Sequence, residues 1–154
     1  MAKTYGEVHD NVINSYCIDF ENGTILFNTV FFGNGGFQEP VSILFKNVMG
    51  YSLSDAIWGS CDLFNIEEYT VEEYINSNED SKSILVDIGN CFPLKYKFNN
   101  HKELMEQIMQ NNQKLYFINP STGLGGWILA EKIILTGNIS KIEDYWDKFY
   151  SKRK

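Results

Sequence analysis

Apolar and polar residues alternate along the first third of the chain, which is typical of strands that bury one face of a sheet. Asn22-Gly23 stands between two such runs and favours a two-residue type I′ turn, so the sequence predicts a β-hairpin there. The turn would pair Tyr16 with Thr29, Ile18 with Phe27 and Phe20 with Ile25 on the core face, and Cys17 with Asn28 and Asp19 with Leu26 on the other face.

Further strands are predicted downstream of this hairpin. Residues 41–48, which follow Pro40, carry apolar side chains at 41, 43 and 45 and form the third predicted strand. Residues 50–55 predict a turn or a short helical segment, and residues 58–66 a half-exposed strand. The remaining predicted strands are residues 84–88, 92–98, 114–118 and 127–135, with Gly89-Asn90 as a turn between the first two of them.

Helix starts are marked by residues whose side chains can cap a free amide. Such signals stand at Thr70 with Glu73, at Asn100 with Glu103 and at Ser140 with Glu143. They predict a short helix to about residue 77, a second helix to about residue 111, and an amphipathic C-terminal helix. The second helix has an apolar stripe that we expect in the core, made of Leu104, Met105, Ile108 and Met109.

Strands outnumber helices, and most strands are joined by loops too short for helical crossovers. The sequence therefore predicts an α+β fold with a largely antiparallel β-sheet of about seven to eight strands and two to three helices. With 154 residues, 44 % of them hydrophobic and 21 % charged, the chain fits one domain over residues 1–154.

The net charge of −7 is concentrated in one segment. Between Lys46 and Lys82 there is no basic residue but eight acidic ones, which gives −8, whereas the rest of the chain has thirteen basic and twelve acidic residues, or +1. The overall acidity disfavours nucleic acid and anionic membranes as partners. The local run fits either a solvated helix with its loops or a docking surface for a basic protein partner.

The second interpretation gives a set of candidate partner-binding residues. Carboxylates would attract the basic partner, and Tyr and Trp suit an interface with a polar rim, although the same aromatic residues also serve to fill a core. The candidate residues are Asp55, Trp58, Asp62, Glu67, Glu68, Tyr69, Glu72 and Glu73.

No motif points to a catalytic residue, a metal ligand or a cofactor. His9-Asp10 has no accompanying ligands, and the glycine-rich stretches at 33–36 and 123–126 lack the spacing of phosphate loops. We therefore expect a protein that is not an enzyme. The alternative is a small-molecule-binding protein or small enzyme with a pocket between sheet and helix, lined by Tyr, Trp and Cys17.

Cysteine usage and the N-terminal residues bear on the compartment. The three cysteines, Cys17, Cys61 and Cys91, are odd in number and fit neither a disulfide framework nor a zinc spacing. The first ten residues carry no apolar run of a signal peptide. We expect reduced thiols and a cytoplasmic location.

Several short stretches resemble a group of small bacterial proteins, some of them similar to immunity proteins of contact-dependent or polymorphic toxin systems. These stretches are residues 9–13 (HDNVI), 24–26 (TIL) and especially 123–130 (GLGGWILA). The resemblance implies a compact α+β domain and a non-enzymatic role. For an immunity protein of this kind, the charge of the acidic segment predicts that this segment masks a basic toxin surface.

Overall fold

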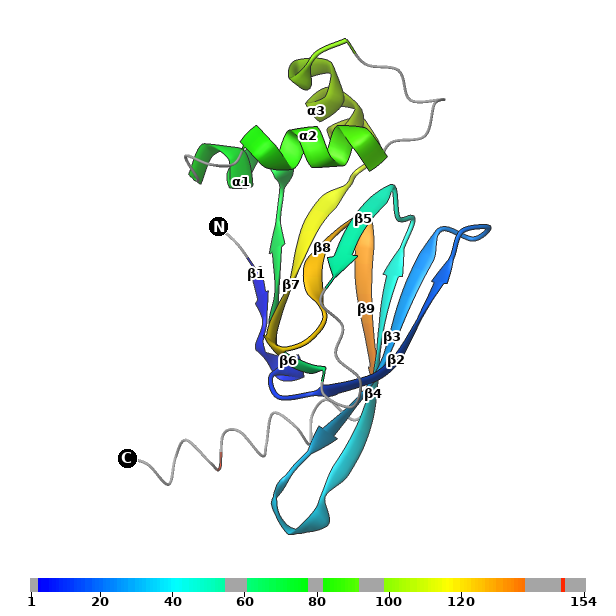
Figure 1. The fold of residues 1–154 in the computed structure, drawn as a ribbon, viewed down its shortest axis with the longest axis vertical. Helices are drawn as coiled ribbons and strands as arrows, with labels where there is room; N and C mark the ends of the chain where they lie inside the picture. Colours follow the sequence, from blue (N-terminus) through cyan, green and yellow to red (C-terminus); the bar gives the residue numbers. More distant parts are fainter. Residues whose placement is uncertain (1–2, 55–60, 78–81, 92–98, 138–147, 149–154) are drawn as a thin grey trace.

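The computed structural model describes residues 3–54, 61–77, 82–91, 99–137 and 148 (Figure 1). Within these ranges nine strands form one sheet with antiparallel pairing throughout, so the α+β prediction is confirmed. The strands are β1 (Lys3–Tyr5), β2 (Val12–Asp19), β3 (Thr24–Phe32), β4 (Gln38–Lys46), β5 (Gly50–Ser54), β6 (Asp62–Tyr69), β7 (Lys114–Thr122), β8 (Gly125–Ala130) and β9 (Lys132–Gly137). The helices are α1 (Val71–Ser77), α2 (Lys82–Cys91) and α3 (His101–Gln110), which gather at one end of the sheet (Figure 1).

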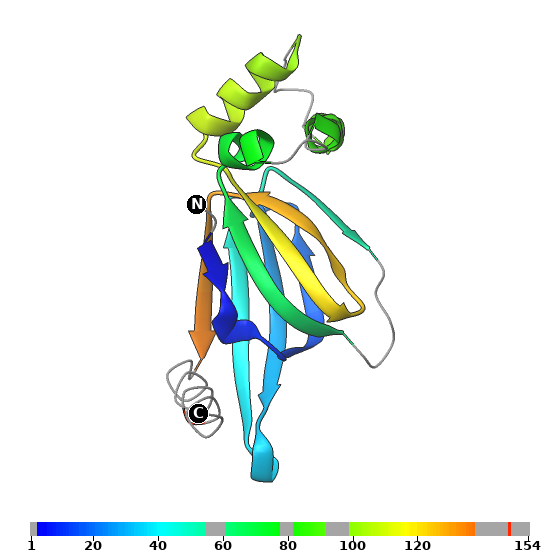
Figure 2. The ribbon, with the colours of Figure 1, turned by 90° about the vertical axis from the view of Figure 1, so that its left-hand side faces the viewer.

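The sheet curls because two bends connect its opposite ends. In the strand order β5-β8-β7-β6-β2-β3-β4-β9, β5 and β8 lie at one end of the sheet and β4 and β9 at the other. The chain nevertheless passes from β4 to β5 through residues 47–49, and from β8 to β9 through the single residue Glu131. The bends lie side by side: Met49 donates its backbone N–H to Leu129 over 2.9 Å, and Glu131 donates to Lys46 over 3.1 Å. Figure 2 shows the result, with β6 and β7 crossing β3 and β4 at an angle.

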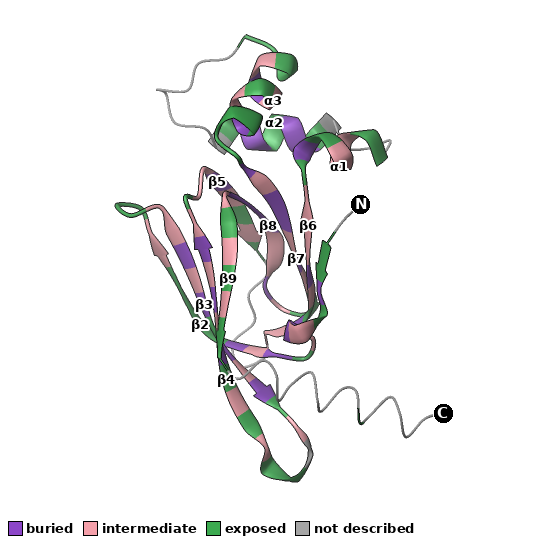
Figure 3. Ribbon diagram, turned by 180° about the vertical axis from the view of Figure 1, so that it is seen from behind, coloured by how far each residue is buried: buried purple, intermediate pink, exposed green. Residues whose placement is uncertain are grey.

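The curled sheet has an apolar interior, and the helices cover part of its outer face (Figure 3). Phe45 joins the two halves of the interior, with ring centroids 5.6 Å from Phe27 and 5.4 Å from Tyr116. On the outside, Leu115, Trp127 and Leu129 of β7 and β8 pack against buried residues of the helices: Val71, Ile84, Leu85, Ile88, Leu104 and Ile108. The protein therefore has two apolar clusters separated by one sheet.

The β2–β3 hairpin forms, but its predicted register is wrong by two residues. Ile18 pairs with Ile25 and Asp19 with Thr24, so the turn has four residues instead of two. Asp19 causes this difference: its carboxylate accepts the backbone N–H groups of Glu21 and Asn22, each over 3.0 Å, and closes the wider turn. A shift of two leaves the side chains within the strands on their predicted faces. Cys17 is accordingly exposed. The prediction for Phe20 is wrong: instead of pairing with Ile25 on the core face, it lies in the wider turn and is 82 % exposed.

Two predictions near the bends are wrong. Residues 50–54 form strand β5 rather than a turn or short helix, because their backbone pairs with β8. The single strand predicted over 127–135 is divided at Glu131 into β8 and β9, which pair with different partners. Both differences come from backbone pairing between segments far apart in the chain, which a local pattern does not contain.

The strand predicted over 84–88 is also wrong, since these residues lie within α2. Ile84, Leu85 and Ile88 are buried while Val86 and Asp87 are exposed, a pattern that follows a helical turn. Gly89-Asn90, predicted as a turn, belongs to the same helix. A short apolar run has no clear period of its own, and the helix is selected by packing against the sheet.

Both capping predictions within the described residues are confirmed. At the start of α1, Thr70 Oγ1 accepts the backbone N–H of Glu73 over 3.1 Å, and the Glu73 carboxylate accepts the backbone N–H of Thr70 over 3.2 Å. Asn100 Oδ1 accepts the N–H of Glu103 over 3.0 Å at the start of α3. Of the apolar stripe on α3, Leu104 and Ile108 are buried, but Met109 is 56 % exposed and is not a core residue.

Asn100→Ala is expected to lower the free energy of unfolding by about 1 kcal/mol, because it leaves the first turn of α3 without its side-chain acceptor. Asn100→Ser supplies a hydroxyl that caps as well and should recover most of the loss. Urea denaturation of the three proteins measures the effect. Equal losses in both variants would show that the cap is not the cause.

The strand predicted over 92–98 and the C-terminal helix lie outside the described residues, apart from Lys148. Asp55 and Trp58, two candidate partner-binding residues, also lie outside them. No helix in the described part of the chain has the length and apolar character needed to cross a membrane.

Candidate functional site

Strand β6 separates two of the candidate glutamates. Glu67 pairs with Phe117 and Glu68 with Tyr116, two residues of β7 that belong to opposite faces of the sheet. Phe117 packs with the helix cluster outside the sheet, and Tyr116 lies in its interior. Glu67 therefore faces outward and Glu68 inward, and the two carboxylates cannot act on one partner together.

Glu67 is held in place on the outer face. Its carboxylate accepts the hydroxyl of Tyr69 over 2.6 Å and the side-chain N–H of Asn119 over 3.1 Å. Asn119 in turn donates to Asn65 Oδ1 over 2.8 Å. The hydrogen bond to Glu67 raises the pKa of Tyr69 to about 12, with burial adding to the shift. The carboxylate is thus oriented before any partner arrives.

An aromatic group adjoins this carboxylate. The ring centroid of Tyr69 lies 5.5 Å from that of Tyr74 on α1 and 5.8 Å from that of Phe117 on β7, and Tyr74 and Phe117 are 4.8 Å apart. All three side chains are half-buried. Together with Glu67 and Glu72 they make up what we call the acidic-aromatic surface.

Helix α1 extends the negative charge. Glu72 is exposed on the first turn, and Glu73 is part of the cap, where the backbone N–H of Thr70 lowers the pKa of its carboxyl group. Within the described ranges, no lysine or arginine lies within 4 Å of the carboxylates of Glu67 or Glu72. The helix dipole favours carboxylates on the first turn of α1, which gives Glu72 and Glu73 a structural reason for their charge. The dipole gives no such reason for Glu67, which is on a strand.

Glu68 forms a different arrangement inside the sheet. Tyr5 on β1 donates its hydroxyl to Glu68 Oε1 over 3.0 Å. Tyr116 is fully buried, and burial together with the neighbouring Glu68 carboxylate raises its pKa far above its ordinary value. Burial and the same carboxylate also raise the pKa of Tyr5. These contacts support the fold and leave Glu68 turned away from an external partner.

The structure thus joins Glu67 to Tyr69, places Glu72 and Glu73 on the first turn of α1 that follows in the chain, and sets Glu68 apart. Asp62 lies at the other end of β6, where it pairs with Val12 and Thr122. Tyr74, Phe117, Asn65 and Asn119 belong to the site but were not predicted from the sequence. The alternation of residues along β6 is visible in the sequence and could have indicated that Glu67 and Glu68 face opposite sides of the sheet. The pairing of β6 with β7, which brings Phe117 and Asn119 to the site, is not visible in the sequence.

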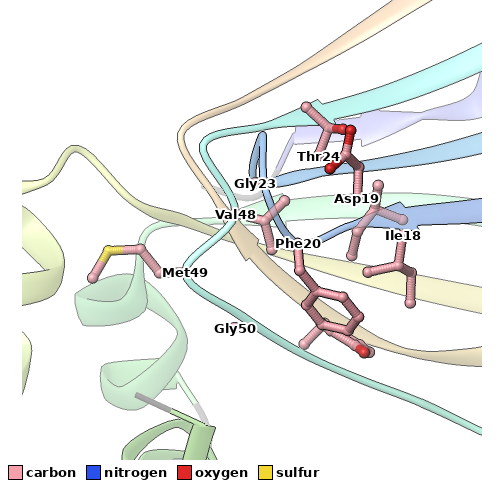
Figure 4. A pocket seen from close by; sticks show the side chains of 10 residues that line it. Ile18, Asp19, Phe20, Gly23, Thr24, Val48, Met49 and Gly50 are labelled. Atoms are coloured by element: carbon pink, nitrogen blue, oxygen red, sulfur yellow. The ribbon is translucent and has the colours of Figure 1, made fainter. Parts of the chain in front are cut away.

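A cavity with a volume of about 490 Å³ opens between the β2–β3 turn and the start of β5 (Figure 4). Its position differs from the pocket between sheet and helix that the alternative function predicts. Cys17 does not line it, and Trp127 packs into the helix cluster instead. In the described part of the chain, no group of three or more His, Cys, Asp or Glu residues is placed to hold a metal ion.

No protein-family model, curated protein or solved structure matches this chain. The similarity to immunity proteins therefore stays a prediction from short stretches of sequence.

Proposed function

We propose that this protein is a non-enzymatic binding module whose acidic-aromatic surface engages a basic surface of another protein. The observation that carries the proposal is the fixed carboxylate of Glu67 beside the rings of Tyr69, Tyr74 and Phe117. The resemblance of the sequence to immunity proteins supports a toxin as that partner, with the surface masking its basic residues.

Aromatic rings and carboxylates contribute differently to such an interface. Half-buried rings provide apolar area at little cost in side-chain entropy, which is why aromatic residues dominate the energetics of many interfaces. Carboxylates without a neighbouring lysine or arginine attract a cationic partner and raise its association rate. Pinning Glu67 to Tyr69 and Asn119 removes part of the ordering cost on binding.

Reversing charge on the acidic-aromatic surface is expected to slow partner association at least about tenfold, since steering depends on the sign of the local charge. The test uses affinity capture from the native cell with three baits: the parent protein, Glu67→Lys/Glu72→Lys, and the charge-matched control Glu39→Lys/Glu106→Lys. The captured protein is then purified, and its association rate is measured at low and high salt.

The proposal requires a basic protein that the parent and the control retain and the surface variant loses, with an association rate that falls as salt rises. Equal retention by the surface variant, or equal loss with the control, would contradict it. An acidic captured protein would do so as well.

A further inference from the structure

Strand β2 is paired along its length on one side only. On that side it pairs with β3 from end to end. On the other side it meets β6 at the single pair of Val12 with Asp62, and Ile13 donates its backbone N–H to Cys61 over 2.8 Å. Beyond Ile13, no strand in the described part of the chain pairs with this side of β2. Because successive residues of a strand turn their N–H and C=O groups to alternate sides, residues 14–19 form an open edge.

The side chains along this open edge are also uncovered. Tyr16 lies opposite Phe27 of β3, on the face of the hairpin that turns toward the interior. Phe27 is fully buried, whereas Tyr16 is 45 % exposed. Residues 14–17 are all exposed, without the alternation that a strand covered on one face shows. Within the described ranges, β2 therefore lacks a neighbour both at its edge and over part of its inner face.

A cavity lies beside the last residues of the open edge. It is the cavity of about 490 Å³ between the β2–β3 turn and β5, and its lining is mainly apolar. Ile18 and Phe20 extend into it from β2 and the turn, toward the strand that begins at Gly50 (Figure 4). Its volume lies in the range of ordinary binding sites, roughly 300–1,000 Å³. The open edge thus borders a space that can receive apolar side chains.

Strand β2 has few of the features that keep an edge strand from pairing with another chain. Edge strands are commonly protected by lysine, by proline, by a bulge or by a short length. β2 has eight residues, none of them lysine or proline, and its one register shift lies near its start, between Ile13 and Ser15. By contrast, β1 has three residues and β9 begins with Lys132. An open, unprotected edge is the kind of surface to which another chain adds a strand.

The charge at the end of this edge distinguishes between possible occupants. Asp19 ends β2, and hydrogen bonds from the side chain and backbone of Asn22 lower the pKa of its carboxyl group, so it is negative at neutral pH. No lysine or arginine is among the described residues that line the cavity. A second copy of the chain would add another −7 of charge and has no basic residue on its own β2. A segment that carries lysine or arginine is favoured instead.

We propose that the open edge of β2 binds an extended segment of another protein as an added antiparallel strand. The backbone of this segment pairs with residues 14–19, and its apolar side chains at alternate positions cover Tyr16 and Ile18. A lysine or arginine near its N-terminal end lies beside Asp19, next to the cavity. The antiparallel direction matches the pairing of every strand in the described sheet.

This inference does not rest on the acidic-aromatic surface. That surface is formed by β6, β7 and α1, whereas the open edge belongs to β2. Glu67→Lys/Glu72→Lys should therefore leave binding at the open edge unchanged. Either site can fail while the other holds.

The test uses the peptide KKVTVTVT, acetylated and amidated, as the probe. In an extended conformation its valines lie on one face and its threonines on the other, and its lysines are at the N-terminal end. Titrations at pH 7 are followed by calorimetry and by amide hydrogen exchange. The peptide should bind with a dissociation constant below about 1 mM. Alternate amides of residues 14–19 should exchange more slowly in the complex, because their N–H groups become hydrogen-bonded.

Three modified peptides distinguish strand addition from other modes of binding. The peptide EEVTVTVT reverses the charge and should bind at least about tenfold more weakly. N-methylation of the valines removes N–H groups from one edge of the peptide, and N-methylation of the threonines removes those of the other edge. One of these two peptides should bind at least about tenfold more weakly than the other, since only one edge pairs with β2.

Two substitutions in the protein test the location of the site. Tyr16→Thr removes apolar area from the open edge but keeps a residue that favours strands, and it should weaken binding about fivefold. Phe32→Thr is the matched control, because Phe32 is 52 % exposed and pairs with Gln38 at the far end of β3. It should leave binding unchanged. Thermal unfolding of each variant confirms its folding.

Three results would overturn the proposal. One is no binding of KKVTVTVT at millimolar concentration, and another is equal binding of the two N-methylated peptides. The third is a dimer of the protein alone in sedimentation velocity that Tyr16→Thr abolishes and Phe32→Thr retains, which would mean that a second copy occupies the edge.

Discussion

Replacing Gly126 by alanine is expected to lower the free energy of unfolding by about 3–5 kcal/mol, the sum of backbone strain and a steric clash. Gly126 has a φ of +141°, which side-chain-bearing residues rarely adopt. A Cβ there would lie 1.9 Å from the carbonyl oxygen of Ser52 on β5. Because that atom belongs to the backbone of the neighbouring strand, β5 would have to move away from β8.

Substitutions at two other glycines separate the contribution of backbone strain from that of the steric clash. Gly35 has a φ of +73° but open space around its Cβ position, so Gly35→Ala should cost about 1 kcal/mol from strain alone. Gly6 has neither a positive φ nor a close neighbour, and Gly6→Ala should be close to neutral. Urea denaturation of all three variants gives the comparison. If Gly126→Ala costs no more than Gly35→Ala, the close approach of β5 and β8 is not as tight as the structure shows.

Features held by contacts within a few residues were predictable from the sequence. The caps at Thr70 and Asn100 are examples, because donor and acceptor are three residues apart and the residue types indicate the bond directly. The strand at 41–45 is another, since alternation marks the buried face without knowledge of its neighbours. The antiparallel α+β class follows from such local signals.

Features that depend on distant pairing were not predictable. Asp19 widens a turn that its neighbours Asn22 and Gly23 alone would keep tight. The bend at Glu131 arises because β8 pairs with β7 whereas β9 pairs with β4. Residues 84–88 form a helix because their apolar side chains pack against the outer face of the sheet. In each case tertiary contacts outweigh local preference.

The same distinction applies to the candidate site. The acidic segment is visible in the sequence, but the opposite directions of Glu67 and Glu68 and the nearness of Tyr74 to Phe117 need the β6–β7 register.

The stability of the protein is expected to fall steeply above pH 10. Tyr5 and Tyr116 both have pKa values raised by burial and by Glu68, so the folded state keeps their protons at a pH where the unfolded chain releases them. Their contribution to stability is complete below about pH 10, the unfolded value, and is lost as pH rises toward the folded values. In that range each tyrosine should lower the free energy of unfolding by about 1.4 kcal/mol per pH unit, or about 2.7 for the pair.

Tyr116→Phe isolates this effect from the titration of lysines and other exposed groups, which both proteins share. The variant keeps the ring that contacts Phe45 and removes only the titrating hydroxyl. Urea denaturation between pH 8 and 11.5 should show similar stability of the two proteins at pH 8 and a slope for Tyr116→Phe that is smaller by about 1.4 kcal/mol per unit above pH 10. Parallel curves would mean that Tyr116 ionises as readily in the folded state as in the unfolded chain, and that the interior around Glu68 admits water.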